Sequence, residues 1–147
     1  MNPDLKLDNQ LCFRLYAASR LVTRLYQPQL EPLGLTYPQY LVLLVLWEQS
    51  PCNVKTLGER LLLQSNTLTP LLKRLEQQGL IHRERDAKDE RVVWIQLSEA
   101  GQALEAQCAC IPAQLLTQLT EPKSAWLELG QQLDKVLAQL KPLVGIQ

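Results

Sequence analysis

Hydrophobic residues recur at helical spacing along most of this chain. From Asp8 to about Leu30 they fall close to every 3.6 residues, which predicts a long first helix with Asp8 as its N-cap and Pro32 beyond its end. The stretch from Tyr40 to Glu48 is apolar almost all round, as in a helix that is packed on every side. A long helix and a central buried helix are therefore expected in the first third of the chain.

Two further helices with a tight junction are predicted next. Asn53 is placed to cap a helix that ends near Leu61. From Ser65 to Gln78 the leucines fall at i, i+3, i+4 and i+7, and Gly79 follows where a left-handed residue commonly ends a helix. Two helices joined in this way predict a helix-turn-helix.

The hydrophobic period then changes from 3.6 toward 2. Residues 91–97 are rich in β-branched and aromatic side chains and are preceded by the short run 80–85, so a β-hairpin is predicted. Its tip, residues 86–90, is charged and has neither glycine nor aromatic residues. We expect this tip to project into solvent as the wing of a winged helix.

Helical patterns return after the hairpin. Ser98 is expected to cap the next helix, and Pro112 is expected to bend that helix beside Cys108, because proline removes a backbone hydrogen bond. Residues 121–140 carry an apolar stripe and predict a last amphipathic helix. The predicted fold class is mainly α with a small β wing, a winged helix-turn-helix domain flanked by N- and C-terminal dimerisation helices.

The element order predicts one domain over residues 1–147. About 36–100 would form the winged helix-turn-helix part, and about 7–35 and 101–147 the dimerisation helices. A first helix of about 23 residues spans roughly 35 Å, too long for a small domain to cover, so its apolar stripe predicts a two-fold homodimer. The alternative is a monomeric helical bundle with an ordinary hairpin.

Composition narrows the function classes. The 15 Lys and Arg residues balance 15 Asp and Glu residues, which excludes a basic coat over the whole surface but leaves room for a local basic face. One histidine and four scattered cysteines form no four-ligand metal pattern, and we expect neither a metal nor a cofactor. No glycine-rich phosphate loop or nucleophile–base–acid set can be built, so the chain is not expected to be an enzyme.

The sequence also bears on the cellular compartment. No apolar run approaches the roughly 18 residues of a membrane span, and the polar start lacks a secretory apolar region. We therefore expect a cytoplasmic protein with no membrane partner. In that reducing compartment structural disulfides are rare, so any cysteine chemistry is expected to be transient and redox-sensing.

Candidate DNA contacts gather at the start of the helix at 65–78 and on the hairpin. Short hydroxyl and amide side chains can reach base edges, cations can meet phosphates, and an arginine on a projecting tip can enter the minor groove. Asp89 is placed to hold Arg91. The candidates for contact with double-stranded operator DNA are Gln64, Ser65, Asn66, Thr67, Thr69, Pro70, Lys73, Arg74, Arg83, Asp89 and Arg91. The alternative is that the Ser, Asn and Thr residues only cap the helix and that the cations belong to an ordinary exposed face.

Four segments carry a resemblance to a known family. They are Leu7–Phe13 (LDNQLCF), Leu35–Leu41 (LTYPQYL), Leu68–Leu75 (LTPLLKRL) and Asp89–Arg91 (DER). Together they resemble MarR-family regulators, and the first two strings are the more specific to the organic hydroperoxide resistance regulator (OhrR) branch. The match runs from Leu7 to about residue 104 and is weakest in the last forty residues.

The resemblance implies a homodimeric winged-helix repressor. Its recognition helix would enter the major groove of the operator, and Arg91 of the wing would enter the minor groove. Pro70 belongs to the LTPLLKRL string, which accounts for a proline one turn into a helix.

Cys12 is the candidate sensor thiol. It lies in the first turns of a helix, where unpaired N–H groups favour a thiolate, and since no Lys or His is near it in sequence, Tyr26 and Tyr37 are candidate hydrogen-bond donors. Cys12 and Tyr26 are 14 residues apart, about 21 Å along one helix, so they can meet only between two subunits. The resemblance implies this arrangement, with Cys12 bonded by the partner's Tyr26 and the partner's Tyr37, and with Tyr16 nearby.

The predicted effector is an organic hydroperoxide that oxidises Cys12 to a sulfenic acid, which a thiol then captures as the operator is released. Two-cysteine members of the branch carry a second cysteine at the position of Thr117, so the capturing thiol stays open here. Cys108, Cys110 and a small-molecule thiol are the candidates, and the two cysteines point about 200° apart on a helix, so they are poorly placed to bridge each other.

Two other functions stay open from the sequence. One is a MarR-type repressor that responds to a bound small aromatic ligand, in which Cys12 is only structural. The other is a thiol peroxidase, an enzyme that turns over hydroperoxide, although the wing and the 65–74 segment would then have no explanation.

Overall fold

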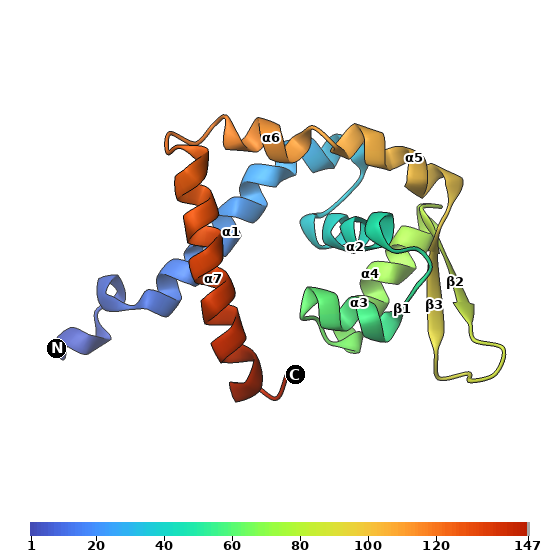
Figure 1. Cartoon of the computed structure of the whole chain (residues 1–147), viewed down its shortest axis with the longest axis horizontal. Coiled ribbons are helices and arrows are strands. Elements are labelled where there is room, and N and C mark those ends of the chain that lie inside the picture. Colours follow the sequence, from blue (N-terminus) through green and yellow to red (C-terminus); the bar gives the residue numbers. More distant parts are fainter. Residues whose placement is uncertain (147) are drawn as a thin grey trace. The chain divides into compact units, whose positions relative to one another are not determined.

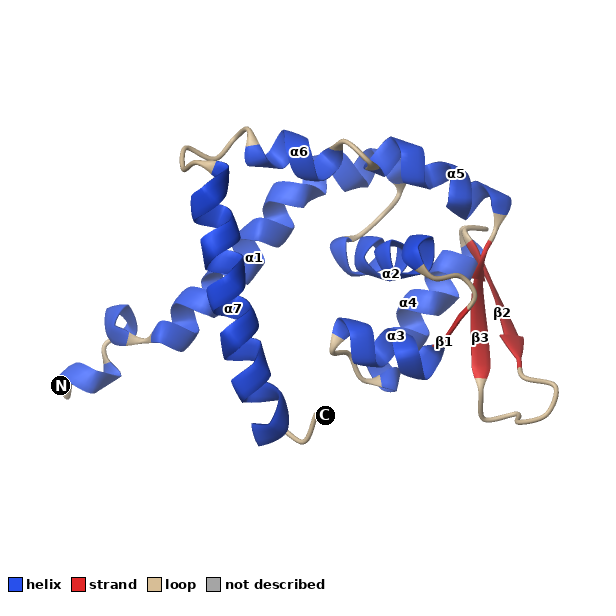
Figure 2. Ribbon diagram, in the orientation of Figure 1, coloured by secondary structure: helices blue, strands red, loops and turns tan. Residues whose placement is uncertain are grey.

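Helices make up most of the protein, whose computed structural model describes residues 1–146 (Figure 1, Figure 2). The helices are α1 (Leu11–Leu30), α2 (Tyr37–Glu48), α3 (Val54–Leu61), α4 (Ser65–Gln77), α5 (Glu99–Cys108), α6 (Ile111–Leu116) and α7 (Lys123–Leu143). The strands are β1 (Cys52–Asn53), β2 (Ile81–Arg85) and β3 (Val93–Leu97), and short 3-10 turns lie at Pro3–Leu5, Leu7–Asn9 and Glu31–Leu33. The predicted mainly α fold with a small β wing is confirmed.

Contacts divide the chain into two compact units, one from Met1 to Ile111 and one from Pro112 onward. The first unit contains α1 to α5 and the sheet, and the second contains α7 and all but the first residue of α6. The single domain over 1–147, with dimerisation helices at its two ends, stays a prediction.

The start of α1 differs from the prediction. Asp8 is not its N-cap, because the chain first makes two 3-10 turns and the helix begins at Leu11, with Gln10 as a cap residue that makes no side-chain cap bond. The Gln10 amide instead donates to the carbonyls of Asp4 and Lys6. The predicted end is confirmed, since α1 runs to Leu30.

Helix α2 forms the centre of the first unit. Val42, Leu43 and Leu46 are fully buried, as the unbroken apolar pattern predicted. The helix begins three residues earlier than predicted, because Thr36 and Gln39 form a capping box in which each side chain accepts the other's backbone N–H. This local signal extends the helix back to Tyr37.

The helix-turn-helix is confirmed, together with its predicted caps. The Asn53 side chain accepts the N–H of Thr56 at 2.8 Å, and Leu62 ends α3 in a left-handed conformation. Helix α4 follows directly, and Gly79 takes a φ of 73°, a conformation that glycine adopts without strain.

The wing belongs to a three-stranded antiparallel sheet with strand order β1-β3-β2. Arg83 of β2 pairs with Ile95 of β3, and Cys52 of β1 pairs with the same Ile95 from the other side. Strand β1 was not predicted, because two residues are too few to show a period. Ile81 and Ile95 are fully buried, so the sheet closes one side of the core.

The helix after the wing is interrupted rather than bent. Ser98 caps α5 as predicted, accepting the N–H of Gly101 at 3.0 Å. Helix α5 then ends at Cys108, and α6 starts at Ile111 with Pro112 in its first turn, where the missing proline N–H leaves no helical bond unmade. The prediction of one helix bent at Pro112 is therefore wrong.

Candidate functional site

Helix α4 presents a polar face to solvent. Leu68, Leu72 and Leu75 are buried on its inner face. The predicted DNA contacts of this region are all exposed, namely Gln64, Ser65, Asn66, Thr67, Thr69, Pro70, Lys73 and Arg74. The structure therefore brings eight of the eleven DNA candidates onto one outward surface.

The side chains at the start of α4 are not used as caps. The N-cap residue of α4 is Gln64, and within residues 1–146 it makes no side-chain cap bond. Thr69 donates its hydroxyl back to the carbonyl of Ser65 at 2.8 Å, within the same helix. This geometry speaks against the alternative that the Ser, Asn and Thr residues here exist only to cap the helix.

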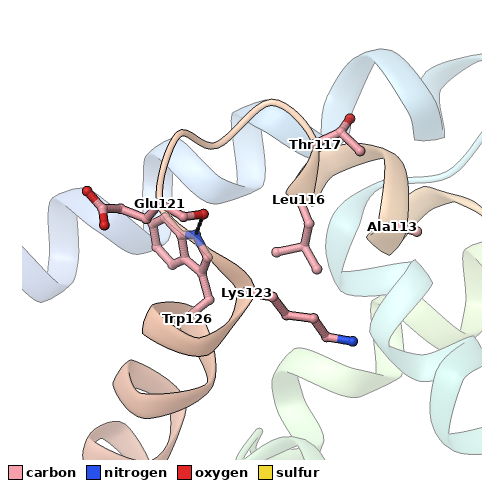
Figure 3. A pocket seen from close by; sticks show the side chains of 6 residues that line it. All are labelled: Ala113, Leu116, Thr117, Glu121, Lys123 and Trp126. Carbon is pink, nitrogen blue, oxygen red and sulfur yellow. Dashed lines mark hydrogen bonds between the residues drawn. The ribbon is translucent and has the colours of Figure 1, made fainter.

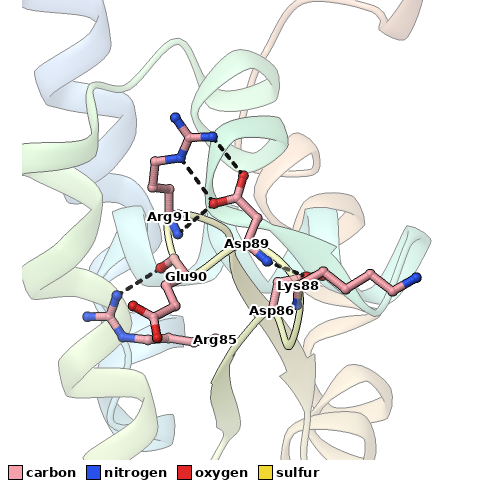
Figure 4. A network of polar contacts seen from close by, with 6 residues as sticks. All are labelled: Arg85, Asp86, Lys88, Asp89, Glu90 and Arg91. Atoms are coloured by element: carbon pink, nitrogen blue, oxygen red, sulfur yellow. Dashed lines mark hydrogen bonds and ion pairs between the residues drawn. The ribbon is translucent and has the colours of Figure 1, made fainter.

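The tip of the wing is organised by two carboxylates (Figure 4). Asp86 accepts the N–H groups of Lys88 and Asp89 at 2.8 and 3.1 Å, and also the indole N–H of Trp94 at 2.9 Å. The Trp94 bond, followed by the two backbone bonds, lowers the pKa of Asp86. The loop is therefore held by an ionised side chain at its base.

Asp89 holds Arg91, as the sequence suggested. Its carboxylate accepts the Arg91 Nε–H at 3.0 Å, Nη2–H at 3.1 Å and backbone N–H at 3.1 Å. The side-chain bond to Arg91 contributes most to lowering the pKa of Asp89. The Arg91 side chain remains 90% exposed, so the contact aims the guanidinium without hiding it.

A cleft lies between the start of α3, α4 and the wing. It encloses about 420 Å³, and its wall includes the cations Lys55, Arg83, Arg85 and Arg91. Cations around a groove of this kind suit the phosphates of a DNA backbone. Lys55 was missed by the sequence reading, because a single lysine in the first helix of the motif carries no signal of its own.

Arg83 differs from the other cations of this cleft. It forms an ion pair with Glu76 of α4, with Nη2 at 2.7 Å and Nε at 2.8 Å from Oε2. Hydrogen bonds from the Arg83 side chain and backbone lower the pKa of Glu76. Glu76 was not among the predicted residues, because nothing in the sequence indicates which cation a helix glutamate will meet.

Three tyrosines meet where α1 packs against α2. The Tyr26 and Tyr37 rings lie 4.8 Å apart between centroids, and the Tyr40 ring lies 5.7 Å from Tyr26 and 6.2 Å from Tyr37. Burial raises the pKa of Tyr26 and of Tyr37, and it is the main cause that raises the pKa of Tyr40 to about 12. At neutral pH these phenols therefore keep their protons and can donate hydrogen bonds.

Cys12 lies far from this chain's own tyrosine cluster. It is the second residue of α1 and is exposed, and Tyr26 lies 14 residues further along the same helix, about 21 Å away. Tyr16 is 62% exposed, with the Arg20 guanidinium 5.4 Å from the centre of its ring. One chain thus brings Tyr26 and Tyr37 together but does not bring Cys12 to them.

The other three cysteines differ in access. All four are free thiols, and of the other three only Cys110 is exposed. Burial raises the pKa of Cys108 and of Cys52, and the neighbouring Cys110 adds to the rise at Cys108. Cys110 is therefore better suited than Cys108 to react with a molecule from solvent.

Thr117 lines a pocket in the second unit (Figure 3). The pocket encloses about 290 Å³, and Trp126 closes one side with its indole N–H donated to the carbonyl of Glu121 at 3.3 Å. A separate cleft of about 410 Å³ lies in the first unit, where Arg24, Thr36 and Tyr37 are among its lining residues.

The described residues contain neither a metal-binding cluster nor a membrane-spanning helix. No group of three His, Cys, Asp or Glu side chains within residues 1–146 could hold a metal ion. No helix in this part of the chain is both long enough and apolar enough to cross a membrane.

Comparisons with known proteins place these features among transcriptional regulators. Residues 24–107 match the family model described as transcriptional regulator SarA/Rot. The organic hydroperoxide resistance transcriptional regulator of Bacillus subtilis is 55% identical over 112 residues, which cover 76% of each chain.

Solved structures show similarity over more of the chain. Reduced AbfR bound to DNA, from Staphylococcus epidermidis, is 42% identical with a TM-score of 0.76 and covers 91% of this chain and 94% of its own. A structure of disulfide-formed AbfR is 43% identical with a TM-score of 0.64, over 89% and 92% of the two chains. Apo MarR from E. coli is 26% identical with a TM-score of 0.70, over 87% and 97%.

Proposed function

This chain belongs to the MarR family of winged-helix transcriptional regulators, in the branch of organic hydroperoxide resistance regulators, and on that premise we propose that it is a homodimeric repressor that senses organic hydroperoxides through Cys12. It is a DNA-binding regulator and not an enzyme. The operator, the effector and the sensing residues belong to the proposal.

One observation carries the proposal: each chain contains two separate halves of a thiol site. One half is the exposed Cys12 at the start of α1, and the other is the Tyr26–Tyr37 pair near its end. A thiolate needs hydrogen-bond donors to be stabilised, and protonated phenols are suitable donors. Two antiparallel α1 helices related by a two-fold axis would bring each Cys12 to the partner's Tyr26 and the partner's Tyr37.

The surface of α1 supports this pairing. The helix has 20 residues, and only Leu30 is buried. Several of its large apolar side chains are exposed, namely Leu11, Phe13, Leu15, Tyr16, Leu21 and Val22. Leu11, Leu15 and Val22 lie on one face of the helix, and an exposed apolar face of this kind is typical of an interface between subunits.

The proposed sensing chemistry is an oxidation of sulfur by peroxide. The Cys12 thiolate attacks one oxygen of the hydroperoxide, the S–O bond forms as the O–O bond breaks, and the departing alkoxide takes a proton to become an alcohol. Sulfur is oxidised to sulfenic acid and the peroxide is reduced. A second thiol then attacks the sulfenic acid, forming a disulfide and releasing water.

The second thiol is proposed to be Cys110 or a small-molecule thiol. Cys110 is exposed, whereas Cys108 is buried and has a raised pKa, which makes it a poorer nucleophile at neutral pH. The position used by two-cysteine members of the branch is Thr117 here and cannot serve. The disulfide-formed AbfR structure supports disulfide chemistry in a relative.

The proposed DNA complex uses α4 and the wing. Helix α4 would place its exposed polar residues in the major groove, Arg91 would enter the minor groove, and Lys73 and Arg74 would meet phosphates. Two α4 helices of a dimer must fit half-sites about 34 Å apart, so a small shift at the α1 interface is sufficient to release the operator. AbfR is known bound to DNA in both its reduced and its overoxidized form, so in that relative the reduced protein binds DNA and added oxygen alone does not prevent binding.

The test is a gel-shift titration on the DNA immediately upstream of the protein's own gene. Reduced wild type should bind, cumene hydroperoxide should release it, and Cys12→Ser should bind but fail to respond. Cys110→Ser separates the two proposed second thiols, because it should still respond if a small-molecule thiol captures the sulfenic acid and should respond more weakly if Cys110 does. Mass spectrometry should find the first added oxygen on Cys12. Release of the Cys12→Ser protein by the peroxide would contradict the proposal.

A second function is favoured by the 410 Å³ cleft that includes Tyr37. A small aromatic ligand bound there would regulate DNA binding without oxidation, and Cys12 would be structural. Release of reduced wild type by salicylate, with Cys12→Ser released at the same concentration, would favour this function.

A further inference from the structure

Arg83 lies on the inward side of strand β2, unlike the exposed cations around it. Burial along β2 alternates, with Ile81 fully buried, His82 exposed, Arg83 half-buried and Glu84 exposed. Successive strand residues point to opposite faces, so Arg83 shares the core face with Ile81. Its side chain is 28% exposed, against 90% for Arg91.

Glu76 accepts two hydrogen bonds from this one residue and also forms an ion pair with it. Oε1 accepts the Arg83 backbone N–H at 3.0 Å, and Oε2 accepts the Nε–H at 2.8 Å and lies 2.7 Å from Nη2. Strand β2 is an edge strand, so its outward N–H groups have no strand partner. A single carboxylate of α4 thus holds both the side chain and the backbone of the wing strand.

We propose that Glu76 and Arg83 form a clamp that sets the direction of the wing relative to α4, and that Arg83 is a positioning residue that makes no phosphate contact. The proposal rests on the proposed DNA-binding function, in which α4 and Arg91 must reach two grooves at once. Glu76 would then strengthen operator binding although it is negatively charged and pairs with a cation that lines the cleft.

Two anchors hold strand β2 of the hairpin, while strand β3 is held by its pairing with β1. The first is at the base of the hairpin, where the Leu80 N–H donates to the Leu75 carbonyl at 3.0 Å and the Ser98 hydroxyl donates to the Gly79 carbonyl at 2.6 Å. The second is the clamp, two residues further along β2 from Ile81. Without the clamp, β2 would be held only at its base and through β3, and a rotation of about 10° over the roughly 17 Å from Ile81 to the tip would move the tip by about 3 Å. The minor groove is only about 6 Å wide, so such a shift would misplace Arg91.

The clamp and a direct phosphate contact predict opposite signs for one substitution. Removing a negative charge near DNA ordinarily strengthens binding, and Glu76→Gln would also free Arg83 for a phosphate. The clamp predicts that Glu76→Gln weakens binding about three- to ten-fold, because part of the contact made by Arg91 is lost. Glu84→Gln is the matched control, since it removes the same charge from the exposed face of β2 and should leave affinity unchanged or slightly higher.

Salt dependence separates the two roles of Arg83. A lost phosphate contact lowers the slope of log affinity against log salt by about 0.9. Arg83→Gln should weaken binding as much as Glu76→Gln does and leave the slope unchanged, whereas Lys73→Ala should lower the slope by about 0.9. The double variant Glu76→Gln/Arg83→Gln should bind no more weakly than either single variant, because both changes remove the same clamp.

The experiment measures how tightly these reduced variants bind a labelled duplex of the upstream DNA at salt concentrations from about 50 to 300 mM. Hydrogen exchange of the Arg83 amide is measured separately, in the absence of DNA. Glu76→Gln should accelerate that exchange, and Glu84→Gln should not. Stronger binding by Glu76→Gln, or a lower salt slope for Arg83→Gln, overturns the clamp. If the wild-type protein shows no preference for the upstream duplex over a scrambled duplex, the proposed function fails. If the Arg83 amide of Glu76→Gln exchanges at the wild-type rate, the clamp is refuted whatever the result with DNA.

Discussion

The wing and α1 belong to the same compact unit but use their exposed side chains in opposite ways. In the wing, Asp86 and Asp89 hold the loop and aim Arg91 through hydrogen bonds within one chain. In α1, only Leu30 is buried, and the exposed side chains include a series of large apolar residues. The wing therefore finds its partners within the chain, whereas α1 leaves most of the large apolar side chains of its first three turns exposed.

The two regions are therefore built on different principles. A polar surface that must meet DNA is preorganised by carboxylates that carry no contact of their own. In the proposed function the thiol has its donors about 21 Å away on the same helix, so only a second chain could complete the site. Dimerisation would then be part of the proposed sensing site as well as of the DNA-binding geometry.

The largest effect is expected when a charge is introduced on the exposed apolar face of α1 that contains Leu15. Leu15→Glu should convert the dimer to monomers and weaken operator binding by about 100-fold or more, because the two half-sites are then no longer bound together. Sedimentation velocity and gel shifts measure the two effects. Arg24→Glu is the control, since Arg24 lies nine residues away, on the opposite side of the helix, and should leave the dimer intact. A Leu15→Glu protein that stays dimeric would refute the assignment of α1.

The wing should respond differently, with loss of affinity but no loss of the dimer. Arg91→Ala should weaken operator binding about ten-fold, because one groove contact is worth about 1 to 3 kcal/mol. Gel shifts at matched salt, with sedimentation as the check on assembly, measure this. Unchanged affinity would count against the entry of Arg91 into the minor groove.

The tyrosine pair should affect the rate of sensing and not DNA binding. Tyr26→Phe should slow the oxidation of Cys12 by cumene hydroperoxide about five-fold, because the thiolate loses one hydrogen bond. Stopped-flow measurement of thiol loss gives the rate. Affinity of the reduced protein for DNA should not change. Tyr16→Phe is a useful companion, since the Tyr16 ring is exposed and lies beside the Arg20 guanidinium. An oxidation rate equal to that of wild type in Tyr26→Phe would remove Tyr26 from the site.

The smallest effect is the loss of the Asp86 hydrogen bonds in the wing at low pH. The hydrogen bonds of the Asp86 carboxylate lower its pKa in the folded protein. The free energy of unfolding that these bonds contribute is therefore complete above the ordinary carboxyl pKa of about 4, and it is lost as the pH falls through the lower pKa of the folded state. The indole N–H resonance of Trp94 should therefore stay constant down to about pH 4 and shift below it. The Trp47 indole is an internal control, because it donates to the carbonyl of Gly101, which does not titrate. A Trp94 resonance that shifts no more than that of Trp47 would contradict the role of Asp86.

The sequence by itself determined the features that depend on neighbours along the chain. The period of the leucines located α4, the change toward a period of 2 located the hairpin, and the cap residues Asn53 and Ser98 marked helix starts that the structure confirms. These signals are local, because a helix or strand face and its caps involve residues only a few positions apart. The Asp89–Arg91 contact was readable for the same reason.

Tertiary structure alone decided which distant residues meet. It paired Glu76 with Arg83, added Tyr40 to Tyr26 and Tyr37, joined β1 to β3, and ended α5 before Pro112 where the sequence predicted only a bend. The identity of each partner depends on how whole elements pack, and many arrangements share the same local pattern. An exposed apolar stripe can be read from α1, but the contacts made by a charged side chain appear only once the chain has folded around it.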